Sequence, residues 1–423
     1  MVSNTYRYRY LVLLSFVFCV ALPAAAQEHG DGQMQHGGGH MHMHGMHGMI
    51  FKGSEKFPTS AYNETKKIRP IERLSLPDMA GDAKKGKMLA YAKNKGRCLS
   101  CHILGPDGNQ PGNVGPNLST YGNKSGRDST YTFQQIWDAR THNPKTMMPA
   151  FGTNNILTKQ EVVDIVAYVN TLKNHVEPPK RPQPQVRNFY VAGEDFTLAD
   201  IYLVQGKKLF RQVGNNGRSC ASCHAPGKKK GPDLKAAATT YPKYDPGRKR
   251  IISLEDRINL CRDKYMDSDP YRLGSRNSNL LTGYIKYLSR RIPVDVATDG
   301  AAAAAIKRGK ASFFRKVGQL TLSCADCHVQ AGGKWLRGQP LSSIKEGGVH
   351  SGTAATWPRH FIAGHDLGLI SLQQRIRHCQ VVSRTYPLKV GSPEYTEMEL
   401  YLTTLANGKP MLAPTKSKLR GQD

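Results

Sequence analysis

Six of the nine cysteines in this 423-residue chain form one repeated motif. The sequence Cys-x-x-Cys-His occurs at 98–102, 220–224 and 324–328. In such a motif two cysteines attach a heme covalently, and the histidine binds its iron. A zinc site or a disulfide loop is the alternative for a single copy, but three copies in one chain favour heme. We therefore predict three covalently bound c-type hemes, attached by Cys98, Cys101, Cys220, Cys223, Cys324 and Cys327, with His102, His224 and His328 as the proximal iron ligands.

Two solitary cysteines, Cys261 and Cys379, end segments of nearly identical sequence after the second and third motifs. Each segment reads Ser-Leu-x-x-Arg-Ile-x-x-Cys, and the two begin at Ser253 and Ser371. On a helix capped by the serine, the leucine, isoleucine and cysteine share one face, which directs the cysteine toward a heme. The arginine one turn earlier can lower the pKa of the thiol. Inert core cysteines or a Cys261–Cys379 disulfide are the alternatives, but the repetition favours thiolate ligands to iron.

The first heme requires a different distal ligand, because no such segment follows its motif. Met147-Met148-Pro149-Ala150-Phe151-Gly152 offers a methionine before a proline in a loop closed by glycine. We predict that Met148 binds the iron, that Met147 packs in the core, and that His142 is a weaker candidate. Ligation by histidine and methionine raises the reduction potential of a heme, which suits an electron exit.

The elements that position these residues read as helices, and no convincing run of strands is present. A helix begins at Thr158, with Glu161 completing a capping box. Another runs near 198–213, and a third near 280–288. The final helix has Ser392 as its cap, Pro393 at its first position and Gly408 at its end. The fold class predicted is all-α, with three cytochrome c-type heme domains in tandem.

Composition divides the chain into six segments. Arg7 and Arg9, an apolar run and Ala24-Ala25-Ala26 indicate a signal peptide, and no other stretch is long and apolar enough to span a bilayer. The segments expected are a signal peptide at 1–26, a His/Met/Gly-rich disordered leader at 27–78, a first heme domain at 79–176, a proline-rich linker at 177–187, and heme domains at 188–295 and 296–423.

A formal net charge of +28 favours anionic partners. These could be a small oxyanion or an acidic protein, and the charge could also serve solubility alone. Export and heme argue against nucleic acid, and the signal peptide indicates the periplasm. The leader either binds a soft metal such as copper or has only incidental metal affinity.

The chain resembles the sulfur-oxidising cytochrome complex in both of its halves. Residues 96–173 resemble SoxX, its monoheme subunit, in 97–102, Gly115-Pro116-Asn117-Leu118, Asn143-Pro144, 148–152 and the helix at 158–172. From Leu203 onward the chain resembles diheme SoxA. The matching segments are 206–210, 219–224, 241–245, 254–262, 322–328, Arg337-Gly338, 372–379 and 399–402. SoxX and SoxA are ordinarily separate chains, whereas here one polypeptide joins them.

The resemblance implies an L-cysteine S-thiosulfotransferase, which joins thiosulfate oxidatively to a cysteine of a SoxYZ-type sulfur carrier protein. It implies that Cys379 is catalytic, beside Arg375, and that Cys261 ligates the other heme of the SoxA-like half. Electrons would leave through the SoxX-like heme to a small acceptor cytochrome c. A second active-site arginine is expected, with Arg359 as the candidate and Arg337 after it. The rival functions are a thiosulfate dehydrogenase forming tetrathionate and a non-catalytic electron-transfer cytochrome.

Overall fold

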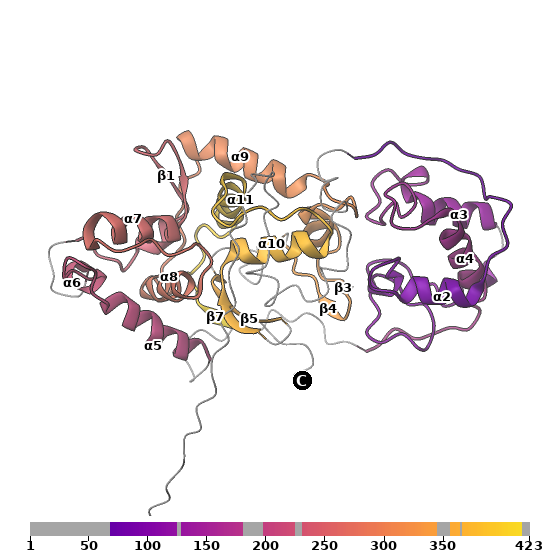
Figure 1. Cartoon of the computed structure of the whole chain (residues 1–423), viewed down its shortest axis with the longest axis horizontal. Coiled ribbons are helices and arrows are strands. Elements are labelled where there is room, and N and C mark those ends of the chain that lie inside the picture. Colours follow the sequence, from indigo (N-terminus) through magenta and orange to yellow (C-terminus); the bar gives the residue numbers. More distant parts are fainter. Residues whose placement is uncertain are drawn as a thin grey trace, which may run out of the picture. The chain divides into compact units, whose positions relative to one another are not determined.

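The computed structural model describes residues 68–124, 128–180, 198–224, 231–344, 356–363 and 366–416 (Figure 1). These residues belong to one compact unit that spans 45–423. Among the described residues, none of the helices combines the length and apolar character needed to cross a bilayer. The predicted signal peptide, most of the predicted leader and residues 181–187 of the proline-rich linker lie outside the described residues, so these predictions stay open.

The first region, residues 68–180, packs helices around the first Cys-x-x-Cys-His motif. Helix α4 begins with the predicted capping box, because the Thr158 side chain accepts from Glu161 N and the Glu161 side chain accepts from Thr158 N. Helix α2 packs closely on α4 at Gly86, where a Cβ would lie 1.9 Å from Asp164 O. The elements are α2 (Ala83–Tyr91), η2 (Cys98–Ser100), η3 (Tyr121–Asn123), α3 (Ser129–Trp137), η4 (Ala139–Thr141) and α4 (Lys159–Asn170).

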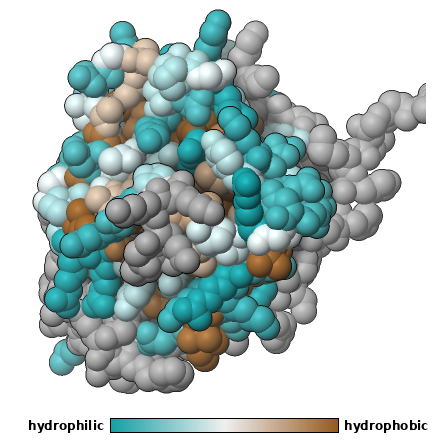
Figure 2. All heavy atoms as spheres, turned by 90° about the vertical axis from the view of Figure 1, so that its left-hand side faces the viewer, coloured by the Kyte–Doolittle hydropathy of each residue, from teal (hydrophilic) through white to brown (hydrophobic). Residues whose placement is uncertain are grey.

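The second region, residues 198–295, surrounds the second motif. Helix α5 packs on α8, and α7 contacts α8 as well. Figure 2 shows the face of the molecule at the left of Figure 1, where apolar residues lie scattered among hydrophilic ones. The elements are α5 (Leu198–Arg211), α6 (Cys220–His224), η5 (Ala237–Thr240), β1 (Lys243–Asp245), β2 (Arg250–Ile252), α7 (Leu254–Met266) and α8 (Arg276–Leu288).

The third region, residues 296–416, combines helices with short strands. Helices α9 and α11 lie side by side (Figure 1), and a glycine permits the contact, since a Cβ at Gly309 would lie 2.1 Å from Glu397 O. The elements are α9 (Gly300–Phe314), η6 (Asp326–Gln330), β3 (Trp335–Leu336), β4 (Gln339–Pro340), β5 (Arg359–Ala363), β6 (Asp366–Ile370), α10 (Leu372–Val382), α11 (Pro393–Thr404) and β7 (Thr415–Lys416).

The prediction of an all-α chain without strands holds only for the helix-rich character of the fold. Two short hairpins, β1–β2 and β3–β4, and a three-stranded sheet in the order β6-β5-β7 are present. Strands of two to five residues are too short to produce a recognisable alternation of apolar and polar residues. The final helix also ends earlier than predicted, at Thr404, because the chain turns back and Gly408 N donates to Val294 O at 2.9 Å.

Candidate active site

The three predicted proximal histidines share one local geometry. The Nδ1 atom of His102 lies 2.8 Å from Pro116 O, that of His224 lies 2.8 Å from Pro232 O, and that of His328 lies 2.9 Å from Ser342 O. Because a carbonyl oxygen only accepts, Nδ1 carries the proton in each ring and Nε2 keeps its lone pair. A histidine prepared in this way presents Nε2 to a metal.

Two glycines leave room for these rings. A Cβ at Gly115 would lie 2.2 Å from His102 Cε1, and one at Gly231 would lie 2.7 Å from His224 Cε1. The cysteines of each motif lie on one helical turn, and all eight described cysteines are free thiols. The Cys261–Cys379 disulfide is therefore absent. Paired thiols, a histidine ring fixed at Nδ1 by a carbonyl oxygen and, in the first two motifs, a glycine beside the ring fit the binding of covalent heme.

Met148 is the methionine that the first region turns inward. It packs against the core formed by α3 and α4, and Gln135 Nε2 donates to its sulfur at 3.5 Å. His142 is exposed and stacks on Tyr131, with ring centroids 4.3 Å apart. The loop closes at Gly152, where a Cβ would lie 2.0 Å from the Trp137 ring. Met148 is therefore packed on the core of the first region, whereas His142 is exposed, and the assignment of Met148 as the distal ligand stays a prediction.

The two repeated segments form helices α7 and α10 with the same cap. Ser253 and Asp256 form a capping box on α7, and Ser371 and Gln374 form the corresponding one on α10. The predicted apolar faces are buried, as Leu254 and Ile258 on α7 and Leu372 and Ile376 on α10. Cys261 and Cys379 are half-buried on these helices, and their role as iron ligands stays a prediction.

The environments of the two thiols nevertheless differ. Burial raises the pKa of Cys261, and the positive charge of Arg257 only partly offsets this effect. Burial also raises the pKa of Cys379, but Arg375, a hydrogen bond with His328 and the charge of Arg337 together bring it down to about 7. His328 and Cys379 thus lie beside each other, and the charges of two guanidinium groups act on the thiol. These two side chains would hold the third heme iron if the prediction is right.

Arg337 reaches this site from an unusual backbone position. Arg337 and Gly338 form the two-residue turn between β3 and β4, with φ angles of 52° and 71°. Such turns favour Asn-Gly, and a left-handed arginine is energetically costly. The charge of Arg337 also acts on Cys101, Cys327 and His378, and its backbone N donates to Ser100 O at 3.1 Å. The hairpin therefore places one cation between the first and third Cys-x-x-Cys-His motifs.

Arg359, the arginine that the sequence favours, lies deeper in the protein. Its side chain is 5% exposed and its guanidinium lies 5.4 Å from the centroid of the Trp357 ring. Burial and the charge of Arg375 lower the pKa of Arg359 to about 9. Arg359 therefore acts on Arg375, whereas Arg337 acts on the thiol of Cys379 itself. Its part in catalysis stays a prediction.

Sequence reasoning overlooked a buried polar cluster that supports α10. Gln373 Nε2 donates to Glu399 Oε2 at 2.7 Å, and Gln373 Oε1 accepts from Gly391 N at 2.7 Å. Burial and the negative charge of Glu255 raise the pKa of Glu399 to about 7. Glu255 and Gln373 are the third residues of the two repeated segments. The available signal in the sequence was that both repeats have a polar residue at this third position, near the start of a helix.

Comparison with known proteins identifies relatives of both halves. The sequence profile of the family described as “Cytochrome c” matches residues 83–173, and that described as “SoxA/TsdA, cytochrome c domain” matches residues 205–294. The chain therefore contains two cytochrome c domains of recognised families.

Curated relatives match about half of the chain. “L-cysteine S-thiosulfotransferase subunit SoxA” of Pseudaminobacter salicylatoxidans is 33% identical over 50% of this chain and 70% of that protein. The subunit of the same name from Rhodovulum sulfidophilum is 30% identical over 52% of this chain and 74% of that protein. A crystal structure of SoxXA from P. pantotrophus covers 52% of this chain and 78% of its own, with 26% identity and a TM-score of 0.46, a similarity too weak to compare the placement of individual residues.

Proposed function

Because the chain belongs to the SoxA family of L-cysteine S-thiosulfotransferase subunits, we propose that it joins thiosulfate oxidatively to a cysteine of a SoxYZ-type carrier protein. The thiol S–H bond of the carrier is broken and a sulfur–sulfur bond to thiosulfate forms. The products are a cysteine S-thiosulfonate, one proton and two electrons. Three c-type hemes, when bound, accept these electrons one at a time.

The observation that carries this proposal is the convergence of a thiol, a proximal histidine and two arginines at one place. Cys379 faces His328, and the charges of Arg375 and Arg337 act on its sulfur. Thiosulfate is a dianion, so it approaches a thiolate only where positive charge offsets the repulsion. A guanidinium can also hold the anion by two parallel hydrogen bonds. Cys261 has Arg257 nearby as its one favourable charge among the causes that shift its pKa.

In this proposal Cys379 forms the new sulfur–sulfur bond, and Arg375 and Arg337 orient the anion. Arg359 sets the position and charge environment of Arg375. Loss of two electrons joins the Cys379 thiolate to the terminal sulfur of thiosulfate. The carrier thiolate then attacks that sulfur, takes the thiosulfate group and restores the Cys379 thiolate.

The path out of the site leads to the first Cys-x-x-Cys-His motif. Cys101 and Cys327 lie close enough for their charges to interact, and Arg337 N donates to Ser100 O at 3.1 Å. Short separation between the attached groups favours electron transfer within the chain. His102 and Met148 would ligate the first iron, His224 and Cys261 the second, and His328 and Cys379 the third. A small periplasmic cytochrome c would accept the electrons.

A thiosulfate dehydrogenase remains the second candidate, because the matched profile is shared by SoxA and TsdA. The two functions differ in their product. We expect the ferric protein, thiosulfate and a SoxYZ-type carrier to give a carrier adduct detectable by intact mass spectrometry. Steady tetrathionate production at the same rate with and without the carrier would instead support the dehydrogenase.

A further inference from the structure

The ammonium group of Lys316 contacts two of the predicted heme-binding segments. Lys316 follows helix α9, and its Nζ donates to Thr146 O at 2.7 Å. The same Nζ lies 3.6 Å from Asp326 Oδ1. Asp326 belongs to the third motif, between Cys324 and His328, and Thr146 precedes Met148 by two residues. Lys316 therefore lies between the third attachment motif and the loop that carries the proposed distal ligand of the first heme.

The carboxylate of Asp326 holds Lys316 at this place. The Asp326 side chain is fully buried. Its Oδ2 accepts from Ser323 N at 2.8 Å, whereas Oδ1 has no hydrogen bond in the described structure. A buried carboxylate is costly without a nearby positive charge. Lys316, itself 24% exposed, supplies that charge.

Thr146 forms hydrogen bonds with both Lys316 and Met148. Its carbonyl oxygen accepts from Lys316, and its Oγ1 accepts from Met148 N at 3.0 Å. Gln135 then fixes the thioether sulfur from the side of α3, as described above. Met148 is thus held at its backbone through Thr146 and at its sulfur through Gln135. Thr146 therefore connects Lys316 to the backbone of Met148.

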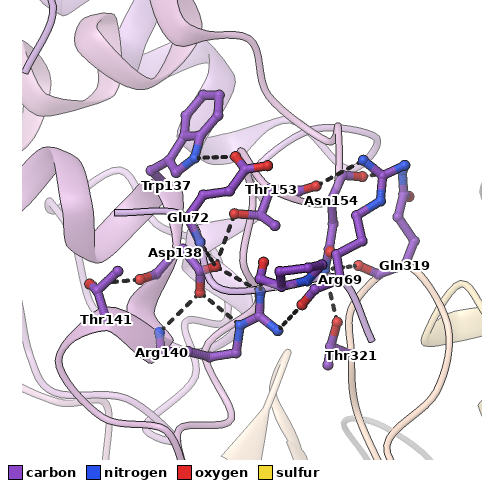
Figure 3. Close-up of polar contacts among 11 residues, drawn as sticks. Arg69, Glu72, Trp137, Asp138, Arg140, Thr141, Thr153, Asn154, Gln319 and Thr321 are labelled. Atoms are coloured by element: carbon purple, nitrogen blue, oxygen red, sulfur yellow. Dashed lines mark hydrogen bonds and ion pairs between the residues drawn. The ribbon is translucent and has the colours of Figure 1, made fainter. Parts of the chain in front are cut away.

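The segment after Met148 is held by the same part of the third region (Figure 3). Asn154 Nδ2 donates to Gln319 O at 2.7 Å and to Thr321 Oγ1 at 2.8 Å. Gln319 Nε2 donates back to Asn154 O at 3.3 Å. Residues 316–321 therefore contact the loop on both sides of Met148, and Lys316 makes the contact on the side that leads directly to it.

We propose that Lys316 is a positioning residue for Met148, and that through Asp326 it links the distal ligation of the first heme to the third attachment motif. The inference rests on the proposed assignment of Met148 as a ligand. A bond between iron and a thioether is weak, so it depends on how firmly the protein holds the sulfur in place. Removing the ammonium frees Thr146 and weakens that bond, which lowers the reduction potential of the first heme.

The test uses the full heme-loaded chain and the charge-transfer absorption band of ferric heme with histidine and methionine ligands. We expect Lys316→Met to lose part of this band and to lower the potential of the first heme, and Lys316→Arg to keep both near wild type. Asp326→Asn should change the band in the same direction as Lys316→Met. The matched control is Lys310→Met, because Lys310 is an exposed lysine on α9, six residues before Lys316 in the sequence. It should leave the band intact.

Two results would overturn the proposal, and they are distinguishable. If Met148→Ala abolishes the band while Lys316→Met keeps the wild-type band and potential, Lys316 does not position the ligand. If Met148→Ala keeps the band, the ligand assignment itself is wrong, and the role of Lys316 is wrong with it. A loss of the band in Lys310→Met as large as in Lys316→Met would also overturn the proposal, because the effect would then come from general loosening of the region.

Discussion

Replacing Glu399 by glutamine should remove a loss of stability that occurs as pH rises. Glu399 is buried on α11, where Glu255 and Asp256 on α7 raise its pKa and Lys286 on α8 and Gln373 on α10 lower it. Burial is the largest influence, and the resulting pKa is about 7, against 4.5 for an ordinary glutamate. Glutamine has the same shape, carries no charge and can still accept the hydrogen bond from Gln373.

The magnitude follows from the linkage between proton binding and folding. Between pH 4.5 and pH 7 the folded protein holds a proton on Glu399 that the unfolded chain releases, so stability falls as pH rises through this window. One pKa unit corresponds to about 1.4 kcal/mol, so the ionised side chain costs the folded state roughly 3 kcal/mol above pH 7. The Glu399→Gln variant should match wild type near pH 4.5 and exceed its stability at pH 8 by up to that amount.

The assay is thermal or urea unfolding of the heme-loaded protein at both pH values. Glu397→Gln is the matched control, because Glu397 lies on the same helix in a surface ion pair with Arg308. Loss of such a pair lowers the free energy of unfolding by at most about 1 kcal/mol, and by a similar amount at both pH values. If the difference in stability between wild type and Glu399→Gln is the same at pH 4.5 and pH 8, the assignment of a proton to Glu399 in the folded protein is refuted.

Two further predictions concern the sites themselves. Gly115→Ala should prevent correct placement of the His102 ring, since the added Cβ would lie 2.2 Å from Cε1. The low-spin signals of the first heme in electron paramagnetic resonance should therefore be lost. Their retention would contradict the prediction and show that this loop adapts. Arg337→Gln should raise the thiosulfate KM by roughly tenfold, the loss of about one charge-assisted hydrogen bond, whereas a change confined to kcat would contradict a role in binding the anion.

Local patterns in the sequence predicted the caps and buried faces of the helices that position the site. The capping box of α4, the serine caps of α7 and α10 and the buried leucine and isoleucine of each repeat involve residues within two helical turns, so their geometry follows from spacing alone. The inward orientation of Met148 also agrees with its place before a proline. The strand β5, which carries Arg359, was not predicted, because its partners β6 and β7 are defined by pairing across the chain rather than by local alternation.

Contacts between distant residues could not be predicted in this way. The charge of Arg337 reaches Cys379 although 42 positions separate them in the numbering, and this depends on a hairpin turn that only the folded chain defines. Lys316 and Thr146 lie 170 residues apart in the sequence. The difference between Cys261 and Cys379 is of the same kind. The repeated segments are alike, and the distinction comes from what the rest of the fold places beside them.

In the proposed function Cys379, and not Cys261, performs the sulfur chemistry. The most direct measurement is the intact mass of a SoxYZ-type carrier after incubation with thiosulfate and the ferric protein, comparing wild type with Cys379→Ala and Cys261→Ala. We predict that the carrier gains one thiosulfate group with wild type and with Cys261→Ala, and none with Cys379→Ala that retains all three hemes. A carrier adduct formed at the wild-type rate by Cys379→Ala would contradict the account.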